Sequence, residues 1–445
     1  MRDIAILILI LFFFFQAIRS VNAGLYTYWW FSIFRPQDFI WGDFFGIPLP
    51  LLAAVFFIGP ALLTKNFPIF DNLLAKLMAL LISLIVLADI VVGCNDVIII
   101  RTIEAFDAII FLLIVLTTSR VVNSEKVLLN LLLVVALSLG FYSGKGGINA
   151  LLTGASYYGQ DNLGGFMSGS NAYALGTGMM IFIMIFCYQA TTRGVLEYLH
   201  FNSRYVWLLT KFRYIILVII CGSIYNIIAL ESRGSFLSTV IGLLFLILLN
   251  KKRFRILALI GITLSIALTV ISLPEGYEDR IKSIFADKEE RDHSAAGRPH
   301  FWSTAIKMAN HYPLGVGPGC FPAFYNDFDS SGGEFGFYRS VHSSHFQILA
   351  DAGYLGVIVW ILIYLVAGYK LIRIRSLVFQ YVSDPPKQDF YINLSNALLC
   401  VILVFFIGGS FYELAYNDII WLTFGLIITI EMKIKNLKLT ERGCI

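Results

Sequence analysis

Two histidines and two serines stand together in the stretch VHSSHFQILADAGYLG, directly before a long apolar run. Histidine titrates close to neutral pH and is the residue most often used as a general base. His342 precedes the expected start of a helix, where the helix dipole disfavours an imidazolium ion and attracts anions. The pattern therefore indicates a neutral His342 that can accept a proton. The alternative is that His342 and His345 are only polar residues at a membrane boundary.

The start of that helix has a sequence signature of its own. Ser344 is followed three residues later by Gln347, with the apolar run behind them. This is the spacing of a capping box, so it predicts Ser344 as the N-cap residue.

Two arginines are expected near the same boundary. Arg233 lies in the tight turn ESRGSF between two apolar runs, and Arg298 precedes Pro299, a residue type that suits the first position of a helix. A guanidinium group can bind a phosphate group through two parallel hydrogen bonds. Two arginines and a neutral His342 suggest a site in which the arginines hold a lipid-linked diphosphate and the histidine deprotonates a hydroxyl group. The arginines would also stabilise the charge on the departing diphosphate without a metal. Each arginine could equally anchor the chain to lipid headgroups.

A metal site is the competing explanation for the acidic residues nearby. Asp327 and Asp329 have the acidic-x-acidic spacing that can bind a divalent ion, but they lie in the Gly- and Ser-rich stretch DFDSSGGEFG, where solvated carboxylates are common. The chain has no phosphate-binding loop, dinucleotide fingerprint or paired-histidine zinc pattern. We therefore expect neither a metal nor a cofactor.

The elements that must position these residues are membrane helices. Hydrophobic residues make up 58% of the 445 residues and charged residues only 14%, with a mean hydropathy of +0.78, whereas a soluble protein carries about 25% charged residues. The alternation typical of a membrane β-barrel is absent. We expect an all-α, polytopic integral membrane protein with 12 spans, at residues 4–19, 47–64, 73–92, 103–118, 126–143, 170–190, 213–231, 235–250, 255–273, 346–370, 391–411 and 416–432.

The N-terminal apolar stretch and residues 24–34 each allow more than one interpretation. The N-terminal apolar stretch shows no small-residue cleavage site, so it is expected to be a span rather than a signal peptide. Residues 24–34 are only about half the length of a span. They could be a short span, a re-entrant segment or an interfacial aromatic belt, so a thirteenth span is possible and the side of Met1 stays open.

The basic loops set the expected orientation. Cytoplasmic loops carry an excess of Lys and Arg, which here would place residues 191–213, 250–255, 370–387 and the C-terminal tail on the cytoplasmic side. The opposite side then holds residues 144–169, 232–234, 274–345 and 412–415. All the chemically interesting residues fall on this outer side.

The organisation is expected to be a single membrane domain with one large outer segment. An N-terminal bundle covers residues 1–273, an outer loop covers residues 274–345, and further membrane helices cover residues 346–445. The outer loop is rich in aromatic residues, so we expect it to be a partly helical cap, with the helix after Arg298 lying on the membrane surface. Cys94 and Cys320 fall on the same side and could pair, but we expect two unpaired thiols.

Several stretches of the chain resemble a known family. SRG at 232–234, GRPHFW and NHYPLGVGPG within 297–319, and HSSHFQILADAGYLG at 342–356 resemble the O-antigen ligase and polymerase superfamily of bacterial membrane glycosyltransferases. MRDIAILILIL, GLYTYWWFSIFRPQDFIWG and LSLGFYSGKGGINALLTGASYYG are similar to the O-glycosylation ligases associated with the exosortase A system.

The resemblance implies a GT-C-type fold in the bacterial inner membrane, with the active site facing the periplasm. It implies that Arg233 and Arg298 bind the diphosphate of an undecaprenyl-diphosphate-linked glycan and that His342 is the general base. Lys145 and Asn171 also match the exosortase-linked group and are expected near the site. Ser343 stands where the superfamily often has Asn, and His345 stands where an aromatic residue is usual, so an exchange of roles between the two histidines is left open.

The partners follow from the same resemblance. They are the lipid-linked glycan donor, a glycan, lipid or protein acceptor, and membrane lipid, with no nucleic acid. The leading hypothesis is a ligase that transfers a preassembled glycan, and its close rival is a Wzy-type polymerase that joins lipid-linked repeat units. A lipid-linked sugar transporter or flippase would need polar groups near the bilayer midplane and often has repeated halves. A non-catalytic scaffold would tolerate alanine at all three site residues.

Overall fold

The computed structural model describes residues 2–39, 49–68, 70–94, 104–153, 169–250 and 297–441. Throughout these ranges the regular structure is helical, and it contains no strand. The helices are α1 (Arg2–Arg19), α2 (Val21–Phe34), the 3₁₀ turn η1 (Pro36–Phe39), α3 (Leu49–Leu63), α4 (Leu73–Val91), α5 (Ala105–Val121), α6 (Glu125–Thr153), α7 (Ser170–Ala190), α8 (Arg193–Tyr198), α9 (Ser203–Ala229), α10 (Arg233–Leu248), α14 (Arg298–His311), α15 (Phe321–Phe328), α16 (Ser344–Tyr381), α17 (Pro385–Gly408) and α18 (Asp418–Glu441).

Six of the described helices are long and apolar enough to cross a membrane: α4, α6, α7, α9, α16 and α17. The shorter apolar helices α3 and α10 add to the bundle. Leu, Ile and Trp side chains on α9 and α16 are exposed, which suits contact with lipid. The chain is thus a multi-pass helical membrane protein. The expected span at residues 255–273 lies outside the described residues, so the count of 12 stays a prediction.

The region that was ambiguous in the sequence forms a helix. Residues 21–34 are α2, which is separated from α1 by Ser20 alone and is largely buried against α3 and α6. Trp29 and Phe31 of α2 are fully buried, and the Trp29 indole donates a hydrogen bond to Thr118 on α5. This segment therefore belongs to the helix bundle rather than to an interfacial belt.

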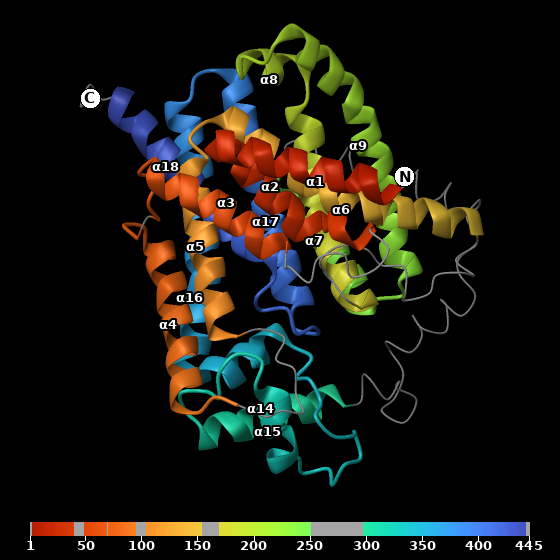
Figure 1. Ribbon diagram of the computed structural model, residues 1–445, viewed down its shortest axis with the longest axis vertical. Helices are drawn as coiled ribbons and strands as arrows, with labels where there is room; N and C mark the ends of the chain where they lie inside the picture. The colour runs from red at the N-terminus through yellow and green to blue at the C-terminus, as the bar shows by residue number, and fades with distance from the viewer. Residues whose placement is uncertain are drawn as a thin grey trace.

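The molecule has two distinct ends (Figure 1). Helices α4, α5 and α16 run along its long axis, α14 and α15 lie across one end, and α8 lies at the other. The first of these ends also holds the turn before α10 and the loop of residues 409–417, because Tyr412 hydrogen bonds to Ser232. At the other end, residues of the segments 189–195 and 389–393 line a common pocket of about 260 Å³. Segments expected on opposite sides of the membrane are therefore separated in the fold.

The end that carries α14 and α15 is a small packed unit, which we call the cap (residues 297–345). Its core contains Phe301, Met308, Phe321 and Tyr325, packed below Ala350 of α16. We expected the apolar residues of α14 to hold it on the membrane surface, but most of them are buried, and contact of this helix with the membrane stays a prediction. Its apolar face is buried inside the cap, because α15, the following loop and α16 cover it.

A kink in α16 receives the glycine-rich loop of the cap. Gly353 has φ 64° and ψ −163°, which interrupts the helix and frees the carbonyl groups before it. The amide groups of Val316 and Gly317 donate hydrogen bonds to the carbonyl oxygens of Ala350 and Asp351, at 2.8 and 3.1 Å. The PLGVGPG stretch thus replaces the missing helical donors and fixes the cap to α16.

This junction leads to a stability prediction. A Cβ atom on Gly353 would lie 1.9 Å from the carbonyl oxygen of Pro313, and the left-handed φ adds strain of about 1–3 kcal/mol. We expect Gly353→Ala to lower the thermal unfolding midpoint of the detergent-solubilised protein strongly. Gly368→Ala is the matched control on the same helix, because a Cβ there meets nothing within 4 Å. Equal melting of the two variants would contradict this account of the kink.

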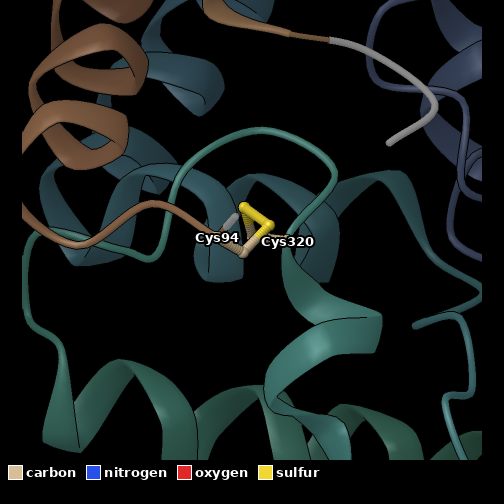
Figure 2. The surroundings of a disulfide bond; sticks show 2 residues. All are labelled: Cys94 and Cys320. Atoms are coloured by element: carbon tan, nitrogen blue, oxygen red, sulfur yellow. A yellow bond between two sulfur atoms is a disulfide. The ribbon is translucent and has the colours of Figure 1, made fainter. Parts of the chain in front are cut away.

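A disulfide bond fixes the cap a second time. Cys94, just after α4, is bonded to Cys320, just before α15, with the two residues 226 positions apart in the chain (Figure 2). The expectation of two unpaired thiols was therefore wrong. The spacing carried no pairing signal, because the two cysteines meet only after the loop following α14 folds back to the end of α4.

Removal of this bond should loosen the cap. Cys94→Ser combined with Cys320→Ser is expected to cost about 2–4 kcal/mol of stability, the usual range for a disulfide. Limited proteolysis would then cut within residues 297–345 faster than in the unmodified protein. Cys221→Ser is the control, because that thiol is free and exposed. Unchanged proteolysis of the double variant would show that the kink alone holds the cap.

Candidate functional site

Arg233 is the first residue of α10, and its position is set by the turn before it. Glu231 has a left-handed φ of 54°, which turns the chain sharply between α9 and α10. Ser232 is the N-cap residue, and its hydroxyl contacts the hydroxyls of Ser235 at 2.9 Å and Tyr412 at 2.8 Å. A Cβ atom on Gly234 would lie 2.8 Å from the Tyr412 hydroxyl. The glycine after Arg233 therefore allows α10 to approach the loop of residues 409–417.

Arg298 begins α14 and faces the same loop. Its guanidinium carbon lies 5.8 Å from the centre of the Phe411 ring, and its buried Nε atom has no hydrogen-bond partner in the described structure. Burial lowers the pKa of Arg298, and the charge of Arg233 acts in the same direction. The two guanidinium groups are thus close enough to repel each other. A bound anion would relieve this repulsion and satisfy the unused donor.

His342 lies beside this pair of arginines. Its ring centre is 5.6 Å from that of Phe301 on α14, and its backbone has a left-handed φ of 52°. Burial and the nearby charges of Arg298 and Arg339 lower the pKa of His342 to about 4. The imidazole is therefore neutral at physiological pH. Desolvation and the two guanidinium groups are causes that the sequence did not indicate.

The backbone before His342 is held by an acidic residue that the sequence analysis did not single out. The buried Glu413 carboxylate interacts with the Ser340 hydroxyl and the Val341 amide, and burial raises its pKa. His342 is thus fixed in an uncommon backbone conformation by contacts on the residues before it. Such strained residues cluster at functional sites.

The start of α16 differs by one residue from the capping-box prediction. The N-cap residue is Ser343, whose side chain accepts a hydrogen bond from the amide of Phe346. Ser344 instead donates to the Tyr412 carbonyl oxygen at 2.7 Å and accepts from the Leu414 amide at 3.0 Å. Gln347 accepts from the Ala415 amide at 2.9 Å. The prediction was wrong because both side chains bind the neighbouring loop rather than their own helix.

The loop of residues 409–417 between α17 and α18 therefore connects the whole site. It contacts the first turn of α10 through Tyr412, Arg298 through Phe411, and the His342 segment through Glu413 and several backbone groups. The only signal for this role in the sequence was a short turn, SFYELAYND, that contains two acidic residues and three aromatic residues between two spans.

The second histidine is fully occupied by hydrogen bonds. The Trp360 indole donates to Nδ1 of His345 at 3.0 Å, and Nε2 lies 2.9 Å from the Phe406 carbonyl oxygen. Nδ1 must then be the acceptor and Nε2 the protonated donor. This arrangement gives His345 a part in packing α16 against α17 and leaves His342 as the histidine beside the arginines.

The remaining residues expected near the site lie farther from its centre or only border it. Asn171 is in the first turn of α7 with an exposed side chain, and its carbonyl oxygen accepts a hydrogen bond from Ser235 of α10. Lys145 is exposed in α6. Its proposed second-shell contact with the substrate stays a prediction.

Asp329, one of the two acidic residues that raised the alternative of a metal site, is held by several hydrogen bonds. Asp329 accepts hydrogen bonds from the Ser331 amide and hydroxyl and from the Gly333 amide, and Nε2 of His300 lies 2.6 Å from its carboxylate. These bonds lower the pKa of Asp329 far below its ordinary value despite its burial. The carboxylate therefore closes the loop that leads to Arg339 and His342.

The part of the chain that carries these residues is also the part with a recognisable relative. Residues 215–361 match the O-antigen ligase family. The matched region covers about a third of the chain and contains Arg233, Arg298 and His342. No curated protein shows significant sequence similarity to the chain. The match supports the resemblance to the O-antigen ligase superfamily and hence a membrane protein of the O-antigen ligase or polymerase type.

Proposed function

We propose that this protein transfers a glycan from undecaprenyl diphosphate to an acceptor hydroxyl on the periplasmic face of the bacterial inner membrane. The observation that carries the proposal is the meeting of Arg233, Arg298 and His342, which come from three distant parts of the chain. All three lie within the region that matches the O-antigen ligase family. Such a family acts on a lipid-linked glycan donor and an acceptor within a membrane.

In the proposed reaction the acceptor oxygen attacks the anomeric carbon of the glycan. The bond from that carbon to the diphosphate breaks, and the diphosphate leaves with the electron pair. His342 takes the proton of the acceptor hydroxyl, while Arg233 and Arg298 neutralise the charge that builds on the diphosphate. The step is a single displacement and would invert the anomeric carbon. It needs no metal, because the guanidinium groups supply the positive charge.

The disulfide bond supports the proposed side of the membrane. Cys94 and Cys320 are bonded at the end of the molecule that carries the site, and disulfides persist in oxidising compartments such as the periplasm. The basic segments 191–213 and 370–387 lie toward the opposite end, which agrees with a cytoplasmic location. The GT-C fold type and the link to an exosortase system belong to the proposal as well.

The experiment that tests this function is deletion of the gene in its host, followed by sizing of the glycans attached to undecaprenyl diphosphate. Accumulated long chains would mean that ligation is the missing step. Accumulated single repeat units would identify the protein as a polymerase, which shares the donor and leaving group. Normal levels of lipid-linked glycan would refute both activities. Complementation with a His342→Ala gene distinguishes an enzyme from a scaffold.

A further inference from the structure

A third arginine, Arg339, faces the site and has not been assigned a role. Its guanidinium carbon lies 5.6 Å from the centre of the Phe301 ring, which is the ring that also contacts His342. The charge of Arg339 acts on His342 in the same direction as that of Arg298. The Nε atom of Arg339 is buried without a hydrogen-bond partner in the described structure, like that of Arg298. Two arginines with unused donors therefore flank the same imidazole.

The segment that carries Arg339 is fixed on both sides. The Tyr338 amide donates a hydrogen bond to the Asn326 side chain at 3.0 Å, and Ser340 is bound by the Glu413 carboxylate. The preceding loop is closed by Asp329 and by stacking of Phe335 on His300, with ring centres 5.2 Å apart. Arg339 is thus held in place before any ligand binds, which is what an electrostatic binding site requires.

Among the residues that the structure describes, the charges that act on His342 are positive. Arg339 on its own segment and Arg298 on α14 are positive, and Arg233 on α10 adds to the charge felt by Arg298. His300 on α14 is paired with Asp329, and Glu413 from the loop of residues 409–417 is bound to the two residues before His342. Asp329 and Glu413 are therefore engaged with the backbone of the cap. A dianionic ligand would offset two of these three positive charges.

We propose that Arg339 is a third diphosphate-binding residue, and that the bound anion between Arg339 and Arg298 is what enables His342 to take the proton. The inference rests on the proposed function and extends it. Without the donor, the two positive charges keep a proton off the imidazole and make it a weak base. With the diphosphate in place, the positive charge near the imidazole is offset, so its affinity for a proton rises. Deprotonation of the acceptor is then coupled to occupancy by the donor.

Binding gives the first test, with the full-length protein in nanodiscs and farnesyl diphosphate as the probe. Loss of a charge-assisted hydrogen bond should weaken binding by about tenfold to a hundredfold in Arg339→Ala, and by less in Arg339→Lys. Lys307→Ala is the control, because Lys307 is an exposed cation on α14 outside the site. The loss of affinity caused by Arg339→Ala should be smaller for farnesyl monophosphate than for farnesyl diphosphate. Equal losses for both lipids, or unchanged affinity for the diphosphate, would overturn the role of Arg339.

A second readout separates the binding role from a merely structural one. The pH profile of kcat/KM reports the free enzyme, and that of kcat reports the enzyme with its donor bound. We expect kcat/KM to fall at low pH with a midpoint near the pKa of His342, about 4. The corresponding fall of kcat should have its midpoint at a higher pH. Arg339→Ala should shift the midpoint of the kcat/KM profile to higher pH, because it removes a positive charge that lowers the pKa of His342. Coincident midpoints in the unmodified protein would overturn the coupling.

The proposal and the function it extends fail in different ways. If the unmodified protein does not bind farnesyl diphosphate at all, both are overturned. If it binds and loses affinity in Arg298→Ala but not in Arg339→Ala, the diphosphate site stands and only the inference about Arg339 is lost. Correct folding of each variant is checked by its melting curve and by intact disulfide formation.

Discussion

His342→Asn is expected to lower the rate of glycan transfer by about 10²–10⁴-fold, the range for loss of a general base. Asparagine tolerates the left-handed backbone found at this position, so the substitution removes the imidazole without adding strain. The variant should still insert into the membrane and bind the donor, because Arg233 and Arg298 are untouched. The measurement is transfer of a labelled glycan from its lipid carrier by the purified protein.

A matched control for this experiment is His311→Asn. His311 is the last residue of α14, at the opposite end of that helix from Arg298, and its side chain is exposed. We expect its replacement to leave transfer unchanged. Normal transfer by His342→Asn would instead refute the assignment of the base, and loss of donor binding in that variant would point to a structural effect.

Arg298→Ala should weaken binding of the lipid-linked donor rather than slow the proton transfer to His342. The guanidinium group has a buried, unused donor and lies next to Arg233. Its loss is expected to raise the KM for the lipid-linked donor by about tenfold to a hundredfold, since hydrogen bonds to charged groups are worth about 1.5–3 kcal/mol. Arg233→Ala should behave in the same way. Lysine at either position should rescue only in part, because a point charge replaces a planar, two-pronged donor.

The control here is Arg204→Ala. Arg204 lies near the start of α9, and its side chain is exposed. We expect no change in KM from this substitution, which removes the same charge far from the site. Donor affinity that stays unchanged in both Arg298→Ala and Arg233→Ala would disprove the diphosphate assignment.

Much of the helix arrangement could be predicted from the sequence, because apolar runs of span length are a strong signal in a membrane protein. The bounds expected for residues 73–92 and 170–190 differ by at most one residue from α4 and α7. Polar residues within such runs were harder to interpret. The expected span at 126–143 continues as α6 to Thr153, because a helix does not end where it leaves the apolar layer.

The site was predictable only in its individual residues. Arg233, Arg298 and His342 were recognisable because each stands beside a helix start or a tight turn. Arg339 and Glu413 were not, because Glu413 interacts with residues that are distant in the chain and Arg339 only shares a neighbour in α14 with His342. The Cys94–Cys320 bond and the burial of the apolar face of α14 were missed for the same reason: both depend on how the cap folds back onto α4 and α16.

The loop of residues 409–417 also bears on the order in which the protein is made. Ser232 and Ser344 both bind Tyr412, yet Tyr412 lies outside the region that matches the O-antigen ligase family. A ribosome must therefore synthesise nearly the entire chain before the first arginine and the histidine can be locked in place. We expect a prematurely terminated product to carry every candidate catalytic residue and still lack the contacts that hold them together.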